Sequence, residues 1–163
     1  MRKPFALIAV LACVAALAWS WLDHVPQAPH VVFQTLSGRQ LAMDELRGRV
    51  VVVKFWATTC TVCLDQMTAT IETYHQFHDK GLDLVAVAMQ YDPANRVIEF
   101  AETARLPFTV ALDVQGKIAR AFDDVSATPT TILVDREGRI VRRYVGEYDK
   151  AELRSAIESA LSS

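Results

Sequence analysis

Two cysteines, Cys60 and Cys63, are the residues of this chain whose type and spacing are best suited to chemistry. They are separated by two residues and follow an apolar run over residues 50–53. A pair of thiols at this spacing can form a reversible disulfide, supply half of a metal site, or lie buried and inert. The residues around the pair decide among these three interpretations.

The redox interpretation depends on where the pair lies along the chain. An apolar strand predicted over residues 50–56 leads into a helix predicted over residues 60–79, which places Cys60 at the helix N-terminus. Free N–H groups and the positive end of the helix dipole favour a thiolate there. A spacing of three brings Cys63 onto the same helix face. We therefore expect Cys60 to be the nucleophile and Cys63, deeper in the helix, to be the resolving thiol.

A metal site is the main competitor, because His75 and His78 complete the string C-x2-C-x11-H-x2-H. Both later gaps are about one residue shorter than in a zinc finger. If residues 60–79 form one helix, Cys63 and His75 are separated by about 18 Å, far beyond a zinc–ligand distance of about 2 Å. No Pro or Gly interrupts residues 64–74. We expect no metal at this pair and two exposed helix histidines.

The front of the chain is predicted to be a membrane segment. Arg2 and Lys3 precede a run of almost wholly apolar residues, 4–22, which would rise about 28 Å as a helix, close to the thickness of the hydrocarbon core. We favour an uncleaved, single-pass anchor over residues 1–24. A signal peptide cut after Ala18 and a lipoprotein signal at Cys13 are the alternatives.

Each of these alternatives places the rest of the chain outside the cytoplasm, where disulfides persist. We expect a short linker over residues 25–30 and one domain over residues 31–163. Without residues 1–28, the chain carries 15 Lys and Arg against 18 Asp and Glu and has no long basic run. This composition predicts no nucleic-acid partner.

Helices and buried strands alternate along the predicted domain. The predicted strands are 31–35, 50–56, 82–90, 108–112, 130–134 and 139–145. The predicted helices are 43–47, 60–79, 92–105, 116–122 and 149–161. Asp92 and Pro93 are suited to the N-cap and first turn of the third of these helices. The order indicates an α/β domain with a central mixed sheet flanked by helices.

The motif FWATTCTVC at residues 55–63 resembles the active-site motif of the thioredoxin superfamily. Residues 128–130, TPT, resemble the cis-proline loop of that superfamily. With the extra strand and helix over residues 82–105, the chain resembles the membrane-anchored TlpA/ResA-like branch over about residues 31–161. The resemblance implies a thioredoxin-like three-layer α/β/α sandwich, a thiol–disulfide oxidoreductase activity and no cofactor.

The resemblance also assigns roles to residues around the cysteines. Pro129 would be cis and would face the Cys60–Cys63 pair, and Thr128 would offer backbone hydrogen bonds to a substrate peptide. Trp56 would flank the active site and contact substrate, although a place in the core is the alternative for so apolar a residue.

Three residues depart from the family pattern. Thr59 precedes the first cysteine, where the family usually has Trp. Lys54 stands where thioredoxins often have a buried acid, and Gln66 stands where ResA-like proteins tend to have Glu. We expect Lys54 either to reach solvent at the end of its strand or to lower the pKa of Cys60 by its charge. Lys54 and Gln66 are therefore candidates for tuning the thiol pKa values.

The resulting prediction is a monomeric enzyme of the bacterial inner membrane whose catalytic domain lies in the periplasm. It would reduce disulfides of client proteins, such as apocytochrome c or metal-site assembly proteins, and would receive electrons from a membrane thiol reductase. A disulfide oxidase or isomerase of the same fold and a copper-site chaperone are the alternatives. A peroxiredoxin is not expected, because Val53 and Ala57 occupy positions where that class needs Pro and Thr.

Overall fold

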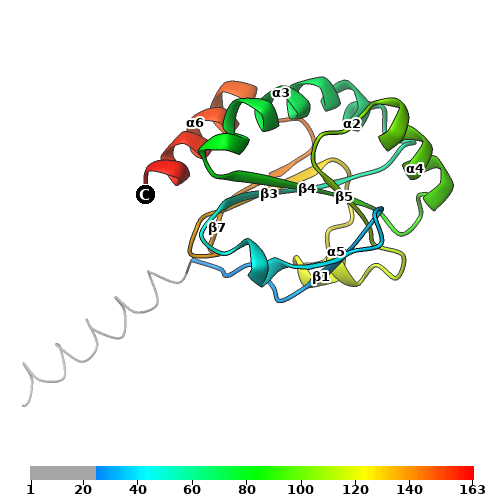
Figure 1. The fold of residues 1–163 in the computed structure, drawn as a ribbon, viewed down its shortest axis with the longest axis horizontal. Coiled ribbons are helices and arrows are strands. Elements are labelled where there is room, and N and C mark those ends of the chain that lie inside the picture. The colour runs from blue at the N-terminus through cyan, green and yellow to red at the C-terminus, as the bar shows by residue number, and fades with distance from the viewer. Residues whose placement is uncertain (1–24) are drawn as a thin grey trace, which may run out of the picture.

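The computed structural model describes residues 25–163 as a single sheet with helices on both faces (Figure 1). The strands are β1 (Val32–Thr35), β2 (Gln40–Ala42), β3 (Val50–Trp56), β4 (Leu82–Ala88), β5 (Thr109–Leu112), β6 (Thr130–Val134) and β7 (Ile140–Val145). The helices are η1 (Met43–Leu46), α2 (Thr61–Asp65), α3 (Met67–Phe77), η2 (His78–Lys80), α4 (Ala94–Thr103), α5 (Lys117–Ala121) and α6 (Lys150–Ser162). None of the helices within residues 25–163 is long and apolar enough to cross a membrane.

The sheet has seven strands in the order β2-β1-β5-β4-β3-β6-β7 and is mixed. Strands β3, β4 and β5 are parallel, whereas β6 pairs antiparallel with β3 and β1 pairs antiparallel with β5. All seven residues of β3 are buried. A largely apolar strand of this kind must be covered on both faces. The burial of β3 and the strand order confirm the mixed central sheet expected from the sequence.

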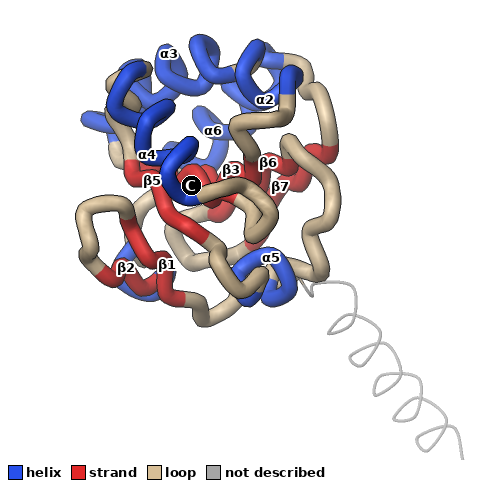
Figure 2. Tube along the Cα trace, turned by 90° about the vertical axis from the view of Figure 1, so that its right-hand side faces the viewer, coloured by secondary structure: helices blue, strands red, loops and turns tan. Residues whose placement is uncertain are grey.

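Two separate cores form the three layers of the domain. Figure 2 shows α2, α3, α4 and α6 on one side of the sheet and α5 on the other. Along β3, Val51, Val53 and Phe55 pack toward α5 and η1, whereas Val50 and Val52 pack toward the four helices of the other side. The side chains of a strand alternate between its faces, so one strand supplies both cores. Lys54 is the one charged member of β3 and belongs to the face that carries α2 and α3.

The helix predicted over residues 60–79 is interrupted at Gln66. It consists of α2 and α3, and Gln66 between them has φ −80° and ψ −11° and is the C-cap of the first and N-cap of the second. The Thr70 hydroxyl donates to the Gln66 carbonyl at 2.9 Å. The Thr70 N–H donates to the same carbonyl at 3.0 Å. No Pro or Gly marks the interruption, which is why the sequence does not reveal it.

The segment predicted as a short linker, residues 25–30, is attached to the domain at Pro26 and Ala28. The Ala28 N–H donates to the Gly138 carbonyl at 2.8 Å, and the Ile140 N–H donates to the Pro26 carbonyl at 2.7 Å. Ala28 is 6% exposed and lies in the core beneath α5 and η1. These two hydrogen bonds attach the segment to the turn between β6 and β7. The anchor or signal segment predicted over residues 1–24 lies outside the described residues.

Candidate active site

The two cysteines lie at the turn that joins β3 to α2. Cys60 is the N-cap of α2, as predicted, and its sulfur accepts the Cys63 N–H at 3.2 Å. The Cys60 N–H donates to the Ala57 carbonyl at 3.1 Å, which closes the turn. The Met89 N–H donates to the Trp56 carbonyl at 3.0 Å and ties the end of β3 to the loop that follows β4. The turn therefore projects from the carboxyl end of the central parallel strands.

Cys60 and Cys63 form a disulfide, with their Cα atoms 5.2 Å apart. Their surroundings differ. Cys60 is partly exposed, whereas Cys63 is 0% exposed and packs with Trp56 and Met67 in the core under α2 and α3. A partner molecule that approaches from solvent reaches the Cys60 sulfur first. This arrangement supports the predicted division into an attacking thiol and a resolving thiol.

Asp92 holds the turn in place, whereas the sequence predicted that it would cap a helix. Its carboxylate accepts the Thr58 N–H and the Thr58 hydroxyl, each at 2.6 Å, and only 7% of the residue is exposed. The prediction of Asp92 as the N-cap of α4 is wrong, because that position is taken by Pro93. Its place just after a buried parallel strand was the available signal, since the carboxyl ends of neighbouring parallel strands meet at one edge of the sheet.

The Thr128–Pro129 peptide bond is cis, as the resemblance implied. Thr130 is the register partner of Phe55, so Pro129 lies beside the end of β3 from which the cysteine turn projects. The Pro129 carbonyl accepts the Gly146 N–H at 2.7 Å, and the Thr128 hydroxyl lies 3.2 Å from the Tyr91 hydroxyl. Within residues 25–163, no backbone hydrogen bond occupies the N–H or C=O of Thr128.

The expectation that Trp56 contacts substrate is wrong for this structure. The Trp56 side chain is 0% exposed, and its ring centroid lies 5.3 Å from that of Phe100 on α4. It fills the core beneath the helices, and its indole Nε1 has no hydrogen-bond partner among the described residues. The core alternative considered for this residue is the one that the structure supports.

Lys54 is buried, so the expectation that it reaches solvent is also wrong. The side chain is 1% exposed, and its Nζ donates to Gln66 Oε1 at 2.8 Å. The Nζ also lies 5.3 Å from the centre of the Tyr148 ring. Burial lowers the pKa of Lys54 to about 8, because an ammonium is destabilised away from water. Lys54 and Gln66, predicted separately as pKa-tuning residues, are thus brought together beneath α2.

The two helix histidines have other partners than the cysteines. His75 is exposed on α3, and the His78 ring stacks on Tyr74 at 4.5 Å between centroids. His78 Nδ1 lies 3.1 Å from the Leu82 carbonyl. Across residues 25–163, no group of three or more His, Cys, Asp and Glu side chains is arranged to hold a metal ion.

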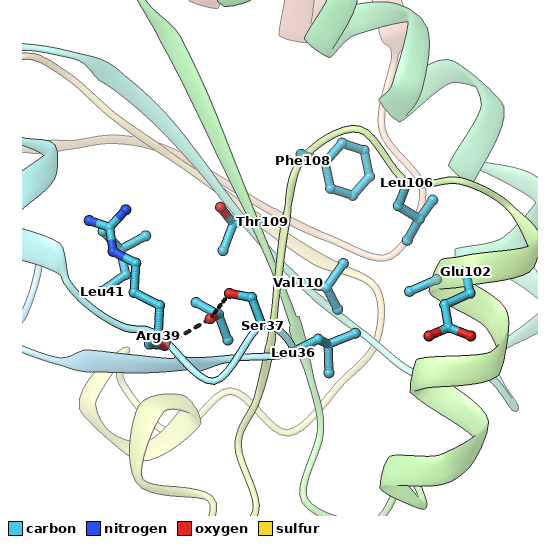
Figure 3. A pocket seen from close by; sticks show the side chains of 11 residues that line it. Leu36, Ser37, Arg39, Leu41, Glu102, Leu106, Phe108, Thr109 and Val110 are labelled. Atoms are coloured by element: carbon cyan, nitrogen blue, oxygen red, sulfur yellow. Dashed lines mark hydrogen bonds between the residues drawn. The ribbon is translucent and has the colours of Figure 1, made fainter.

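A pocket of about 330 Å³ lies away from the cysteines (Figure 3). It opens between the β1–β2 hairpin and the segment from the end of α4 to β5, with Arg39 and Leu41 on one side and Glu102 and Leu106 on the other. The Thr35 hydroxyl donates to the Arg39 carbonyl at 2.8 Å and organises the hairpin. Neither cysteine lines this pocket.

A dithiol–disulfide couple at a helix N-terminus beside a cis-proline, on this sheet, defines a thioredoxin-fold oxidoreductase. The comparisons with known proteins agree. The family model described as Redoxin matches residues 26–161. A thiol–disulfide oxidoreductase ResA from Bacillus cereus is 30% identical over 132 residues, covering 81% of this chain and 75% of its own. The thioredoxin-like protein YneN from Bacillus subtilis is 32% identical over 136 residues, covering 81% and 77%.

Solved structures give the same result. The solution structure of a candidate thioredoxin from Neisseria meningitidis superposes with a TM-score of 0.78 at 31% identity, covering 83% of this chain and 90% of that one. A candidate thiol:disulfide interchange protein DsbE from Chlorobium tepidum gives 0.76 at 30% identity, covering 85% and 98%. The chain belongs to the redoxin family, as a TlpA/ResA-like member of the thioredoxin superfamily, and is a thiol–disulfide oxidoreductase.

Proposed function

We propose that this protein reduces disulfides of extracytoplasmic client proteins through the Cys60–Cys63 dithiol. The observation that carries the proposal is the contrast between a partly exposed Cys60 at the N-terminus of α2 and a fully buried Cys63. The Cys60 thiolate attacks one sulfur of a client disulfide, and the second client sulfur leaves as a thiolate. Cys63 then attacks Cys60, which releases the first client sulfur and leaves the disulfide seen here.

The client would bind beside the cis-proline. The unoccupied backbone N–H and C=O of Thr128 can pair with an extended client segment, and Pro129 fixes the direction in which they point. Tyr91, whose hydroxyl contacts the Thr128 hydroxyl, is 55% exposed and adds an apolar surface next to this edge. Lys54 and Gln66 complete the site as groups that tune the pKa values of the thiols.

The proposed cellular setting rests on the sequence of residues 1–24. The positive start and apolar run of residues 1–24 support a single-pass anchor in the bacterial inner membrane, with the domain in the periplasm and acting as a monomer. A membrane thiol reductase would then return electrons to the disulfide. Apocytochrome c and proteins that assemble metal sites are the clients we propose to test.

Oxidation or isomerisation of client disulfides by the same pair is the second candidate. Disulfide couples of this chemistry extend from about −270 mV in a reductant to about −120 mV in an oxidant. The residues between the cysteines, Thr61 and Val62, do not distinguish these directions. Delivery of copper by the same fold is a further alternative, which copper retention by the purified protein would support.

The reduction potential of the Cys60–Cys63 couple tests the proposed direction. It is measured on the full chain carrying Cys13→Ser, equilibrated against graded thiol–disulfide buffers. A potential at or below about −250 mV supports a reductant that a membrane partner must recharge. A potential near −130 mV would make the protein an oxidant. A Cys60→Ser control must show no two-electron transition.

A further inference from the structure

Lys54 is a buried basic group beneath α2. Its side chain is 1% exposed, and an ammonium has three N–H donors to satisfy. The Gln66 carbonyl oxygen accepts one of them at 2.8 Å. Thr131 is the register partner of Lys54 on β6, and its buried hydroxyl has no hydrogen-bond partner among the described residues. Lys54, Gln66 and Thr131 therefore form a small cluster of polar side chains inside the apolar core beneath α2.

The groups that face Lys54 include no carboxylate paired with it. Tyr148, from the turn before α6, lies beneath the Nζ, and burial raises the pKa of its phenol. Tyr144 on β7 is the register partner of Thr131, and burial raises the pKa of that phenol too. The β4 neighbour, Ala86, is uncharged.

Carboxylates of the neighbouring elements have other places, and that of Asp92 accepts both donors of Thr58. Glu152 on α6 accepts the Tyr144 hydroxyl at 3.3 Å, and Asp65 on α2 is exposed. Within residues 25–163, no ion pair involves Lys54. The thiols of Cys60 and Cys63 join these titratable groups when the disulfide is reduced.

Cys63 is the cysteine that shares the helix face of Gln66. The two residues are three apart across the end of α2, and both are buried, at 0% and 8% exposure. Side chains at this spacing are neighbours, so the partner of Lys54 lies next to Cys63. On the sheet, Trp56 follows Lys54 by two residues, lies on the same face, and packs in the core that holds Cys63. Cys60 instead lies at the solvent end of the turn.

In the disulfide state the cysteines offer Lys54 no negative charge, whereas in the reduced state a thiolate can supply one. When the disulfide is reduced, Cys63 becomes a thiol that can ionise, and opposite charges that lie close together favour each other's charged forms. We propose that Lys54, held by Gln66, is the proton-transfer partner of Cys63. This inference rests on the proposed thiol–disulfide exchange and adds the group that makes its second step possible.

The step starts from a mixed disulfide between Cys60 and a client. The neutral Lys54 amine takes the proton of the Cys63 thiol and becomes an ammonium. The Cys63 thiolate attacks the Cys60 sulfur, the Cys60–Cys63 bond forms, and the bond from Cys60 to the client sulfur breaks. The client leaves as a thiolate and takes both electrons. Because the pKa of Lys54 in the disulfide state is about 8, roughly a tenth of Lys54 is neutral near pH 7.

The two thiols can be followed separately with the chromogenic disulfide dithiobis(nitrobenzoate). In the reduced full chain carrying Cys13→Ser, attack by Cys60 releases one nitrothiobenzoate in a phase that depends on reagent concentration. Attack by Cys63 releases the second in a phase that does not. In Lys54→Met, we expect the second phase to slow by about 10²-fold at neutral pH, the lower end of what a positioned base contributes, and the first to change by less than about threefold.

The pH profile separates proton transfer from a structural role. The second-phase rate of the parent protein should rise with pH to a plateau, whereas in Lys54→Met it should keep rising to the higher pKa of an unassisted buried thiol. Lys117→Met, which removes an exposed lysine from α5 on the opposite face, should leave both phases and their profiles unchanged. An unchanged second phase in Lys54→Met overturns the proposal but leaves the reductase function standing.

Two other results would also overturn it. A change confined to the first phase would mean that Lys54 acts on Cys60. No reagent-dependent first phase in the parent protein would contradict the proposed function itself. Gln66→Glu provides a variant of nearly equal volume. Its carboxylate should raise the pKa of Lys54 and move the second-phase midpoint up by one pH unit or more. A midpoint that stays or falls contradicts the role given to Lys54.

Discussion

Cys60 and Cys63 are identical residues three positions apart, but the fold gives them opposite surroundings. Cys60 is partly exposed, caps α2, and follows a turn that the Asp92 carboxylate fixes through Thr58. Cys63 is 0% exposed and lies on the core side of the same helix. The fold thus separates the step that meets a partner from the step that completes the exchange.

The two cysteines also have different neighbouring elements. The loop after β4 restrains the Cys60 side through hydrogen bonds near the surface. The Cys63 side is backed by β3, through Lys54 and its bond to Gln66. Substitutions on the two sides should therefore alter different measurable steps.

Replacing each cysteine separately should separate the two roles completely. Cys60→Ser should abolish turnover of a disulfide client, because the exposed nucleophile is lost. Cys63→Ser should still attack but should retain the client as a mixed disulfide, which mass spectrometry of non-reduced protein detects. If Cys60→Ser instead accumulates the mixed disulfide, the assignment of the two thiols is reversed.

Lys54→Met should change how the stability of the oxidised protein depends on pH. The folded-state pKa of Lys54 is about 8 and its ordinary value is 10.5, so between these values the unfolded chain binds more protons than the folded one. Stability of the parent protein should therefore rise with pH above about 8, whereas below that pH the buried cation is destabilising. The shift corresponds to at most about 3 kcal/mol.

Urea unfolding of both proteins from pH 6 to pH 10 measures this difference. Lys54→Met should be the more stable protein at pH 6, and its advantage should shrink as the pH approaches 10. The window ends there because the pKa of Tyr148 is raised by burial, so stability falls as the pH rises through the ordinary pKa of that phenol. A constant difference across the range would mean that burial does not lower the pKa of Lys54 in the folded protein.

Asp92→Ala should destabilise the turn that leads to Cys60. It leaves the Thr58 N–H without its acceptor, which should lower the free energy of unfolding by about 1–3 kcal/mol. Asp65→Ala removes an exposed carboxylate from α2 and should stay within about 0.5 kcal/mol of the parent. Equal effects of the two substitutions in urea unfolding would show that the Thr58 bonds do not stabilise the turn.

Tyr91→Phe should have the smallest effect. It removes the hydroxyl that lies 3.2 Å from the Thr128 hydroxyl at an exposed position, so the free energy of unfolding should change by less than about 1 kcal/mol. If Tyr91 contributes to client binding through its ring, KM for a disulfide peptide should stay within about twofold in Tyr91→Phe and rise in Tyr91→Ala, with kcat unchanged in both. A loss of kcat in Tyr91→Phe would assign the hydroxyl to the reaction itself.

The sequence predicted the features that depend on local pattern. The apolar runs of β3 and β4, each with a single charged residue, predict strands inside a sheet. The hairpin of β6 and β7 follows from its central Asp-Arg-Glu-Gly turn. The position of Cys60 at a helix N-terminus followed from the strand before it. The resemblance supplied the cis peptide bond at Pro129, which no local pattern distinguishes from an ordinary proline.

The sequence failed where a long-range contact decides the environment of a residue. Lys54 carries a charge, so its residue type predicts exposure. Its burial is offset by the hydrogen bond from its Nζ to Gln66, which belongs to another element. Asp92 before a proline has the local pattern of a helix cap, but its carboxylate bonds across to the cysteine turn. The resemblance placed Trp56 beside the active site with the core as the alternative, and packing against Phe100 places it in the core.

The hydrogen bonds of Pro26 and Ala28 determine where the chain joins the domain. Their partners, Ile140 and Gly138, flank the turn at the end of β6 that is farther from the cysteines. The seven residues of β3 span about 20 Å between the two ends of the sheet. If the proposed anchor precedes Val25, the cysteines lie at the end of the domain that faces away from the membrane. A bulky folded client can then approach Cys60 without steric hindrance from the membrane.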